Sequence, residues 1–82
     1  MEKEKIKVIT IRSTIDRRTV LRAYFCTNER AAIADYSAEC LPGGGSNVAH
    51  KPRIGWCVDT PRGAYYARAE EAYWIDGIGV VI

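Results

Sequence analysis

The chain has 82 residues, a length that allows one small domain with one core and leaves any pocket shallow or shared with a partner. Apolar residues make up 48% and charged residues 27%, a balance that excludes both a disordered chain and a membrane-spanning helix. Twelve basic and ten acidic residues give a formal net charge of +2, which is too balanced for a dedicated nucleic-acid binder and excludes an acidic DNA mimic.

Two strands and a helix are predicted in the first half of the chain. Residues 5–13 are rich in β-branched side chains, and the apolar positions change parity after Val8, which predicts a bulge or a strand buried on both faces. A polar turn joins this strand to a second one at 19–27, so the two are expected to form an antiparallel hairpin. Residues 30–41 place their apolar side chains on one helical face, and a proline and three glycines then end the helix.

The next segment, residues 43–52, is rich in glycine and is predicted to be a long loop. A third strand is expected at 54–59. The turn sequence Pro61-Arg62-Gly63 then leads into a returning strand at 64–68, because proline and glycine favour the backbone angles of a tight hairpin.

A last hairpin is predicted to pair residues 73–75 with 78–82 around the Asp76-Gly77 turn. The alanines and glutamates of residues 61–74 leave a second helix there as the alternative. The main prediction is a single compact domain over residues 1–82. We expect an α+β two-layer sandwich with one helix and an antiparallel sheet of about five strands, in the order ββαβββ.

Arginine dominates the basic residues beyond the N-terminal segment, and it is the cation typical of interfaces. Arg17 and Arg18 are expected at the tip of the first hairpin, on a surface shared with its two strands. The candidate partner-binding arginines are Arg12, Arg17, Arg18, Arg22, Arg53 and Arg62. Two interpretations stay open, an ordinary solvated surface with ion pairs, or contact with an acidic protein surface or with phosphate.

Eight aromatic residues are more than so small a core is expected to bury. Tyr65 and Tyr66 are adjacent, so a strand must turn one of them outward. These two tyrosines and Trp74 are the candidate apolar anchors of an interface, since tyrosine, tryptophan and arginine are typical of binding hot spots. The same side chains can stack on bases, but the sequence lacks the interleaved glycines and aromatics of ribonucleoprotein motifs.

The sequence carries no catalytic or cofactor signature. Cys26, Cys40, Cys57 and His50 supply zinc-type ligands, but no two cysteines have the close spacing of a zinc site. A cysteine nucleophile would depend on His50, the single histidine, and the glycines of residues 43–45 follow a helix where phosphate-binding loops precede one. We therefore predict no enzyme, no metal and no cofactor.

The compartment is predicted from the first residues and the thiols. Residues 1–5, MEKEK, have no apolar stretch, so we expect no secretory signal. A cytoplasmic location follows, with three reduced cysteines acting as small buried hydrophobic residues.

In overall build the chain resembles small phage-encoded inhibitors of bacterial defence, the anti-CRISPR proteins. The shared features are the charged start MEKEK, one α+β domain near 80 residues, the lack of a catalytic signature and a mixed arginine and tyrosine surface. The resemblance extends to no motif, so no residue role is carried over. It implies a stoichiometric inhibitor in the cytoplasm of a bacterial host, which binds and sterically blocks a CRISPR effector or a similar nucleic-acid-handling complex.

The predicted function is accordingly a non-catalytic protein–protein interaction module, with a larger protein or ribonucleoprotein complex as partner and no membrane contact. The alternative is a small nucleic-acid-binding domain that uses the same arginines. Both a monomer and a dimer are compatible with the sequence. If the apolar residues 78–82 lie at a sheet edge, they offer unpaired backbone to a second copy.

Overall fold

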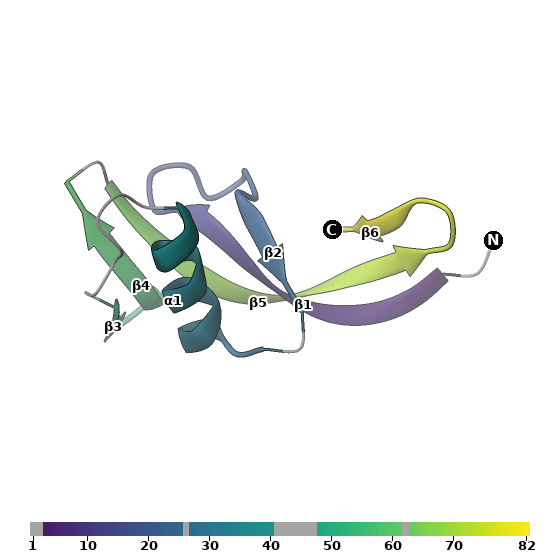
Figure 1. Cartoon of the computed structure of the whole chain (residues 1–82), viewed down its shortest axis with the longest axis horizontal. Helices are drawn as coiled ribbons and strands as arrows, with labels where there is room; N and C mark the ends of the chain where they lie inside the picture. Colours follow the sequence, from purple (N-terminus) through teal and green to yellow (C-terminus); the bar gives the residue numbers. More distant parts are fainter. Residues whose placement is uncertain (1–2, 26, 41–47, 62) are drawn as a thin grey trace.

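The structure, a computed structural model, describes residues 3–25, 27–40, 48–61 and 63–82 (Figure 1). In these residues one helix and six strands follow each other as β1 (Lys3–Ser13), β2 (Arg22–Tyr24), α1 (Glu29–Cys40), β3 (Val48–Lys51), β4 (Gly55–Thr60), β5 (Gly63–Ile75) and β6 (Gly79–Val81). All pairs are antiparallel, in the order β2-β1-β5-β4-β3, and β6 also pairs with β5. The described residues therefore form an α+β fold, as the sequence predicts.

The two long strands, β1 and β5, form the centre of the sheet. They pair without interruption from Lys3 opposite Ile75 to Ser13 opposite Tyr65, so β1 contains no bulge. Residues 8–12 of β1 are all buried. The parity change in the sequence thus marks a strand buried on both faces.

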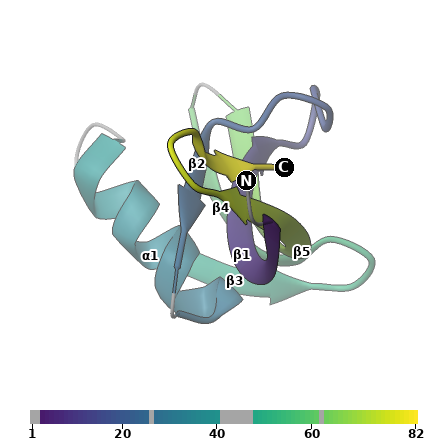
Figure 2. The ribbon, with the colours of Figure 1, turned by 90° about the vertical axis from the view of Figure 1, so that its right-hand side faces the viewer.

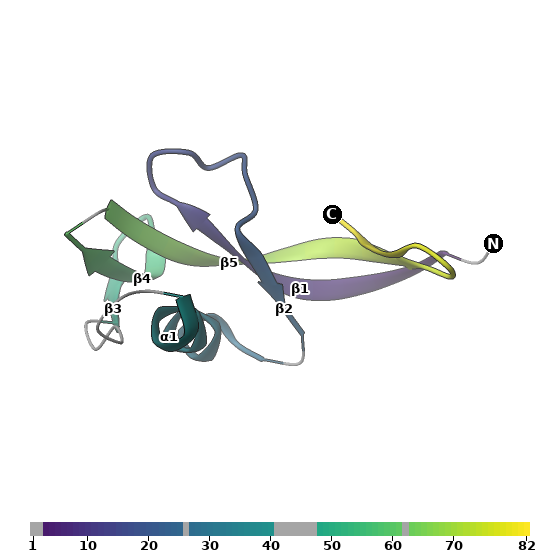
Figure 3. The same ribbon diagram turned by 45° about the horizontal axis from the view of Figure 1, so that its top comes forward.

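Helix α1 covers one face of the sheet (Figure 3). It begins where the Asn28 side chain accepts a hydrogen bond of 2.8 Å from the Ala31 amide, a typical N-cap. Ile33 and other buried helix side chains pack on Ile9 and Ile11 of β1 and form the core of the domain. Burial of these apolar side chains is what holds the helix to the sheet.

The opposite face of the sheet is approached by the loop between β1 and β2, residues 14–21, which we call the β1–β2 loop (Figure 3). Its first residue is tied to the start of β5, since the Thr14 amide donates a 3.0 Å hydrogen bond to the Ala64 carbonyl. Its last residue is tied to β1, where the Leu21 amide donates to the Ile11 carbonyl at 2.8 Å. The loop therefore has both ends fixed to the sheet.

Beyond the helix, β1 and β5 continue together as a narrow ribbon that ends in the β5–β6 hairpin (Figures 1 and 2). We call residues 3–7 and 71–82 the arm, and the rest of the described chain the compact half. Helix α1 packs on β1, β3, β4 and β5 in the compact half. The arm makes the molecule elongated, with extents of 44 × 25 × 21 Å.

Several predicted elements need correction. A strand, β3, lies in the segment predicted as loop, so the described order is ββαββββ where ββαβββ was expected. The second strand is limited to residues 22–24 of the predicted 19–27. The alternative helix at 61–74 is wrong, because β5 is an unbroken strand that joins the two short strands predicted there. Leu41, the predicted last residue of the helix, lies outside the described residues.

Candidate binding surface

The β1–β2 loop exposes an apolar side chain between basic ones. Ile15 is 87% exposed, the highest value among the large apolar residues described. Arg17 and Arg18, two of the predicted partner-binding residues, follow it in the same loop and are both exposed. Neither arginine has a carboxylate within salt-bridge distance among the described residues. Their charges are therefore available to a partner.

Arg12 holds this loop from beneath. It is 7% exposed and lies on the sheet face opposite α1. Its guanidinium donates to both carboxylate oxygens of Glu70, at 2.9 and 2.7 Å, and to the main-chain carbonyl of Arg17 at 2.6 Å. Such a bidentate pair is among the strongest polar contacts in proteins. Arg12 was predicted to bind a partner, but its burial gives it a supporting position under the loop.

Glu70 is kept ionised by the same network. Burial alone raises the pKa of Glu70, but hydrogen bonds from Thr10 and Arg12 and the positive charge of Arg12 outweigh that effect. The pKa of the carboxyl therefore lies below its ordinary value. The Thr10 hydroxyl donates to Glu70 at 2.7 Å, so the carboxylate is bonded from two residues of β1.

Hydrogen bonds inside the loop add to its order. The Asp16 carboxylate accepts from the Arg18 amide at 3.1 Å and from the Thr19 hydroxyl at 2.7 Å. These bonds, that of Thr19 first, lower the pKa of Asp16. Aspartate that bonds its own following backbone is typical of a defined turn. The loop thus presents Ile15 and its arginines in one fixed arrangement.

The other predicted arginines do not join this surface. Arg22 lies on the helix side of β2, where it forms a 3.1 Å ion pair with Glu39 and donates a hydrogen bond to the Cys40 sulfur. Arg53 sits in the β3–β4 turn with a left-handed φ of 69°. Arg62 lies outside the described residues. The six predicted arginines therefore do not form one continuous patch in the described structure.

The predicted aromatic anchors are also separated. Tyr66 is buried on the sheet face opposite the helix, with the Arg17 guanidinium 5.8 Å from its ring centre. Tyr65 is partly buried and packs on Tyr36 of α1, with ring centres 5.7 Å apart. Trp74 alone is well exposed, on the arm. The two tyrosines thus serve packing, and only the tryptophan is open to a partner.

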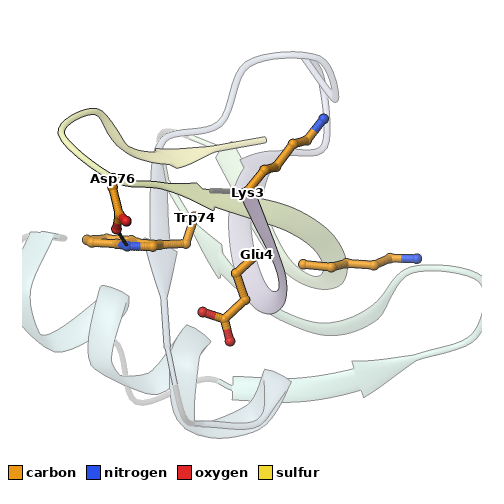
Figure 4. A pocket seen from close by; sticks show the side chains of 5 residues that line it. Lys3, Glu4, Trp74 and Asp76 are labelled. Carbon is orange, nitrogen blue, oxygen red and sulfur yellow. Dashed lines mark hydrogen bonds between the residues drawn. The ribbon is translucent and has the colours of Figure 1, made fainter. Parts of the chain in front are cut away.

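Trp74 lies beside a hollow of about 520 Å³ at the end of the arm (Figure 4). Its indole N–H donates a 3.2 Å hydrogen bond to Asp76, and Glu4 is its direct cross-strand neighbour. Lys3 points away from these three side chains (Figure 4). On the other face of the ribbon, the Lys3 ammonium lies 4.0 Å from the ring centre of Tyr73.

Apart from Trp74, the exposed apolar end of the arm was not among the predicted site residues. The large apolar side chains exposed there are Tyr73, Trp74, Ile78, Val81 and Ile82. The signal in the sequence is the apolar segment 78–82, which is predicted to offer unpaired backbone to a second copy if it lies at a sheet edge. A cluster of this kind is typical of an interaction site.

The thiols and the imidazole do not form a reactive group in the described residues. Cys57 is buried, its sulfur donates to the Ala49 carbonyl at 3.6 Å, and burial raises the pKa of the thiol. The His50 ring contacts Trp56 on the other face of the sheet. Cys40 is exposed, contrary to expectation, and Cys26 lies outside the described residues.

The described ranges contain neither a metal-binding group nor a membrane-spanning helix. No group of three or more histidine, cysteine or acidic side chains there is arranged to hold a metal ion. No helix in the same ranges has the length and apolar character needed to cross a membrane. The glycine segment 43–45 lies outside the described residues.

Comparison with known proteins gives no relative from which a function can be transferred. The chain matches no protein-family model, no curated protein and no solved structure. Its function therefore has to be inferred from the geometry of the β1–β2 loop and the arm.

Proposed function

We propose that this protein is a non-catalytic protein–protein interaction module whose recognition surface is the β1–β2 loop. The observation that carries the proposal is Ile15, 87% exposed in a loop that is fixed at both ends and from beneath. An exposed isoleucine has no structural use there, whereas a partner that covers it gains its apolar area. Because the loop is ordered before binding, little further conformational entropy is lost on association.

The flanking charges define the partner. Arg17 and Arg18 would form bidentate pairs with carboxylates, or with phosphates, around the contact of Ile15. A surface that combines an apolar pocket with acidic side chains fits this loop best. The finer proposal is a stoichiometric inhibitor of the anti-CRISPR type, which covers a working surface of a nucleic-acid-handling complex in a bacterial cytoplasm. Steric block requires a rigid body of this kind and no catalytic pocket.

A nucleic-acid-binding domain remains the second candidate, because two unpaired arginines on one loop also suit phosphates. Against it stands the pairing of the other cations. Lys5, Arg12, Arg22 and Lys51 each form an ion pair with a carboxylate. Apart from Arg17 and Arg18, the cations without a carboxylate partner among the described residues are spread over β1, α1 and the β3–β4 turn, at Lys3, Lys7, Arg30 and Arg53.

The test of the proposal is a set of matched variants in affinity capture. The wild-type protein is immobilised, partners are captured from a bacterial lysate and identified by mass spectrometry, and the strongest is purified for titration. The double variant Arg17→Glu with Arg18→Glu and the single variant Ile15→Ala should each weaken binding at least tenfold without lowering the melting temperature. Arg53→Glu is the control, since the β3–β4 turn lies apart from the loop (Figure 2). If the loop variants bound the partner as tightly as the wild type, the β1–β2 loop would not be the recognition surface.

A salt series separates the two candidate functions. Fluorescence anisotropy with labelled single- and double-stranded oligonucleotides measures nucleic-acid binding directly. A nucleic-acid-binding domain loses affinity steeply as salt rises. Its binding releases counterions from the phosphates, and this release is less favourable at high salt concentration. The interaction module instead shows no oligonucleotide binding at low salt, together with one-to-one binding of its protein partner.

A further inference from the structure

The end of the arm carries an uncharged sheet edge. β6 pairs with β5 through Gly79, Val80 and Val81, and the described residues place no strand on its other side. The segment 77–82 contains neither a charged residue nor a proline. Ile78 and Ile82 are 63% and 52% exposed. An edge with unpaired backbone and apolar side chains is open to the addition of another strand.

The opposite edge of the arm has the reverse character. β2 pairs with β1 only at residues 9–11, so the described structure places no strand beside residues 3–8 on the side away from β5. Lys3, Lys5 and Lys7 alternate along this edge on one face of the ribbon. If two copies paired antiparallel here about a two-fold axis, residues of equal parity would face each other, and lysine would meet lysine. This edge therefore rejects a second copy.

The same geometry at β6 gives a self-complementary contact. A two-fold axis at Val80 places Val80 opposite Val80, Gly79 opposite Val81, and Ile78 opposite Ile82. Every one of these cross-strand pairs is apolar, and none brings like charges together. We infer that the occupant of this edge is β6 of a second copy, paired antiparallel about Val80. The interface is isologous, as in most homodimers.

The interface is short, so the dimer is weak and exchanges with the monomer. Five residues of each copy pair, and together they bury far less area than a standard stable interface does. The inference does not depend on the proposed function, because the β1–β2 loop belongs to the compact half. The dimer nevertheless carries two such loops, which lets it bind a partner that offers two sites more tightly than one loop can.

Sedimentation equilibrium between about 10 μM and about 1 mM protein measures the dimer. Ile78→Lys combined with Ile82→Lys places lysine opposite lysine at both ends of the paired segment and should raise the dimer dissociation constant at least tenfold. Ile78→Glu combined with Ile82→Lys places opposite charges at the same two contacts. That pair should dimerise at low salt and weaken as salt increases. Both side chains are exposed in the monomer, so circular dichroism and melting temperature should be unchanged.

The control adds the same charge next to β2, which β1 and β5 separate from β6 in the sheet. Leu21 and Phe25, 45% and 50% exposed, are replaced by lysine together, which should leave the dissociation constant unchanged. A wild-type protein that is monomeric at the highest concentration overturns the inference. So does a dimer that the lysine pair at 78 and 82 weakens no more than the control pair. If the variant with Ile78→Glu and Ile82→Lys does not dimerise at low salt, the register about Val80 is excluded.

Discussion

The compact half and the arm are built from the same two strands in opposite surroundings. In the compact half, Ile9 and Ile11 of β1 lie under α1 and are almost wholly buried. In the arm, Tyr73 and Trp74 of β5 are exposed on the two faces of the ribbon. One continuous strand pair thus provides both a core and a surface, according to what covers it.

The contacts that remain in the arm are of a weaker kind. Lys5 pairs with Glu71 across the ribbon at 3.0 Å, but both side chains are largely exposed, so solvent screens the attraction. The ammonium of Lys3 lies over the Tyr73 ring, again at the surface. Apart from Ala72, which is buried, the arm is therefore held mainly by its backbone ladder. The contacts that stabilise the fold are concentrated in the compact half, and the apolar side chains of the arm remain open to a second copy.

The largest difference should appear when one isoleucine from each region is shortened. Ile11→Ala removes a wholly buried side chain between α1 and the sheet and should lower the free energy of unfolding by about 2–5 kcal/mol. Ile78→Ala removes the same atoms from an exposed position and should change it by less than about 0.5 kcal/mol. Urea denaturation of dilute protein measures both. Equal losses would mean that the arm is as strongly packed as the core.

A second comparison uses adjacent glutamates. Glu70→Gln removes the carboxylate that faces the buried Arg12, and should cost about 3 kcal/mol because a buried charge loses its partner. Glu71→Gln makes the same chemical change on the arm, where the partner Lys5 is exposed, and should leave the unfolding free energy unchanged. Amide exchange of Arg18 should also accelerate in Glu70→Gln alone, since Arg12 then no longer fixes the loop. An unaffected loop would show that Arg12 does not support it.

Acid should reduce the difference between Glu70→Gln and the wild type. The pKa of Glu70 is lower in the folded chain than its unfolded value of about 4.3, so the carboxylate stabilises the fold above that pH. This stabilisation is lost as the pH falls through the folded pKa. The unfolding free energies of the two proteins should therefore converge in acid. Asp16, whose pKa is also lowered, contributes equally to both and cancels in the comparison. If the difference in unfolding free energy stayed constant down to about pH 2, the loss in Glu70→Gln would not come from the charge of the carboxylate.

The elements with local signals were predictable from the sequence. The parity change after Val8 predicted either a bulge or two-sided burial, and the structure has the second. The helix was predicted to begin within one residue of its observed start. Both β5 hairpins were predicted from their turn residues. Gly77 has a φ of 81°, a left-handed angle that glycine adopts without strain. In each case the residues that decide the structure are neighbours in the chain.

The remaining features depend on residues that are distant in the sequence. β3 has few strand formers, and its identity comes from pairing with β4, as where Val48 lies opposite Val58. The sequence predicted Arg12 to be a surface cation. Its partner in the buried ion pair, Glu70, is 58 positions further along the chain and gives no local signal. The sequence thus predicted that Arg17 and Arg18 lie together in the loop, but not that a buried Arg12–Glu70 pair supports them.

The smallest expected effect tests whether the two regions unfold together. Gly77 in the β5–β6 turn and Gly55 in the β3–β4 turn have φ values of 81° and 88°, and an added Cβ would meet no atom within 4 Å at either. Alanine at each position therefore costs backbone strain alone, about 1 kcal/mol. Gly55→Ala should lower the global free energy of unfolding by that amount. Gly77→Ala should leave the global value unchanged and instead speed amide exchange of β6 about fivefold, because the arm opens before the compact half unfolds. If both variants lowered the global value equally, the arm and the compact half would form one cooperative unit, and the exposed edge of β6 would be as rigid as the core.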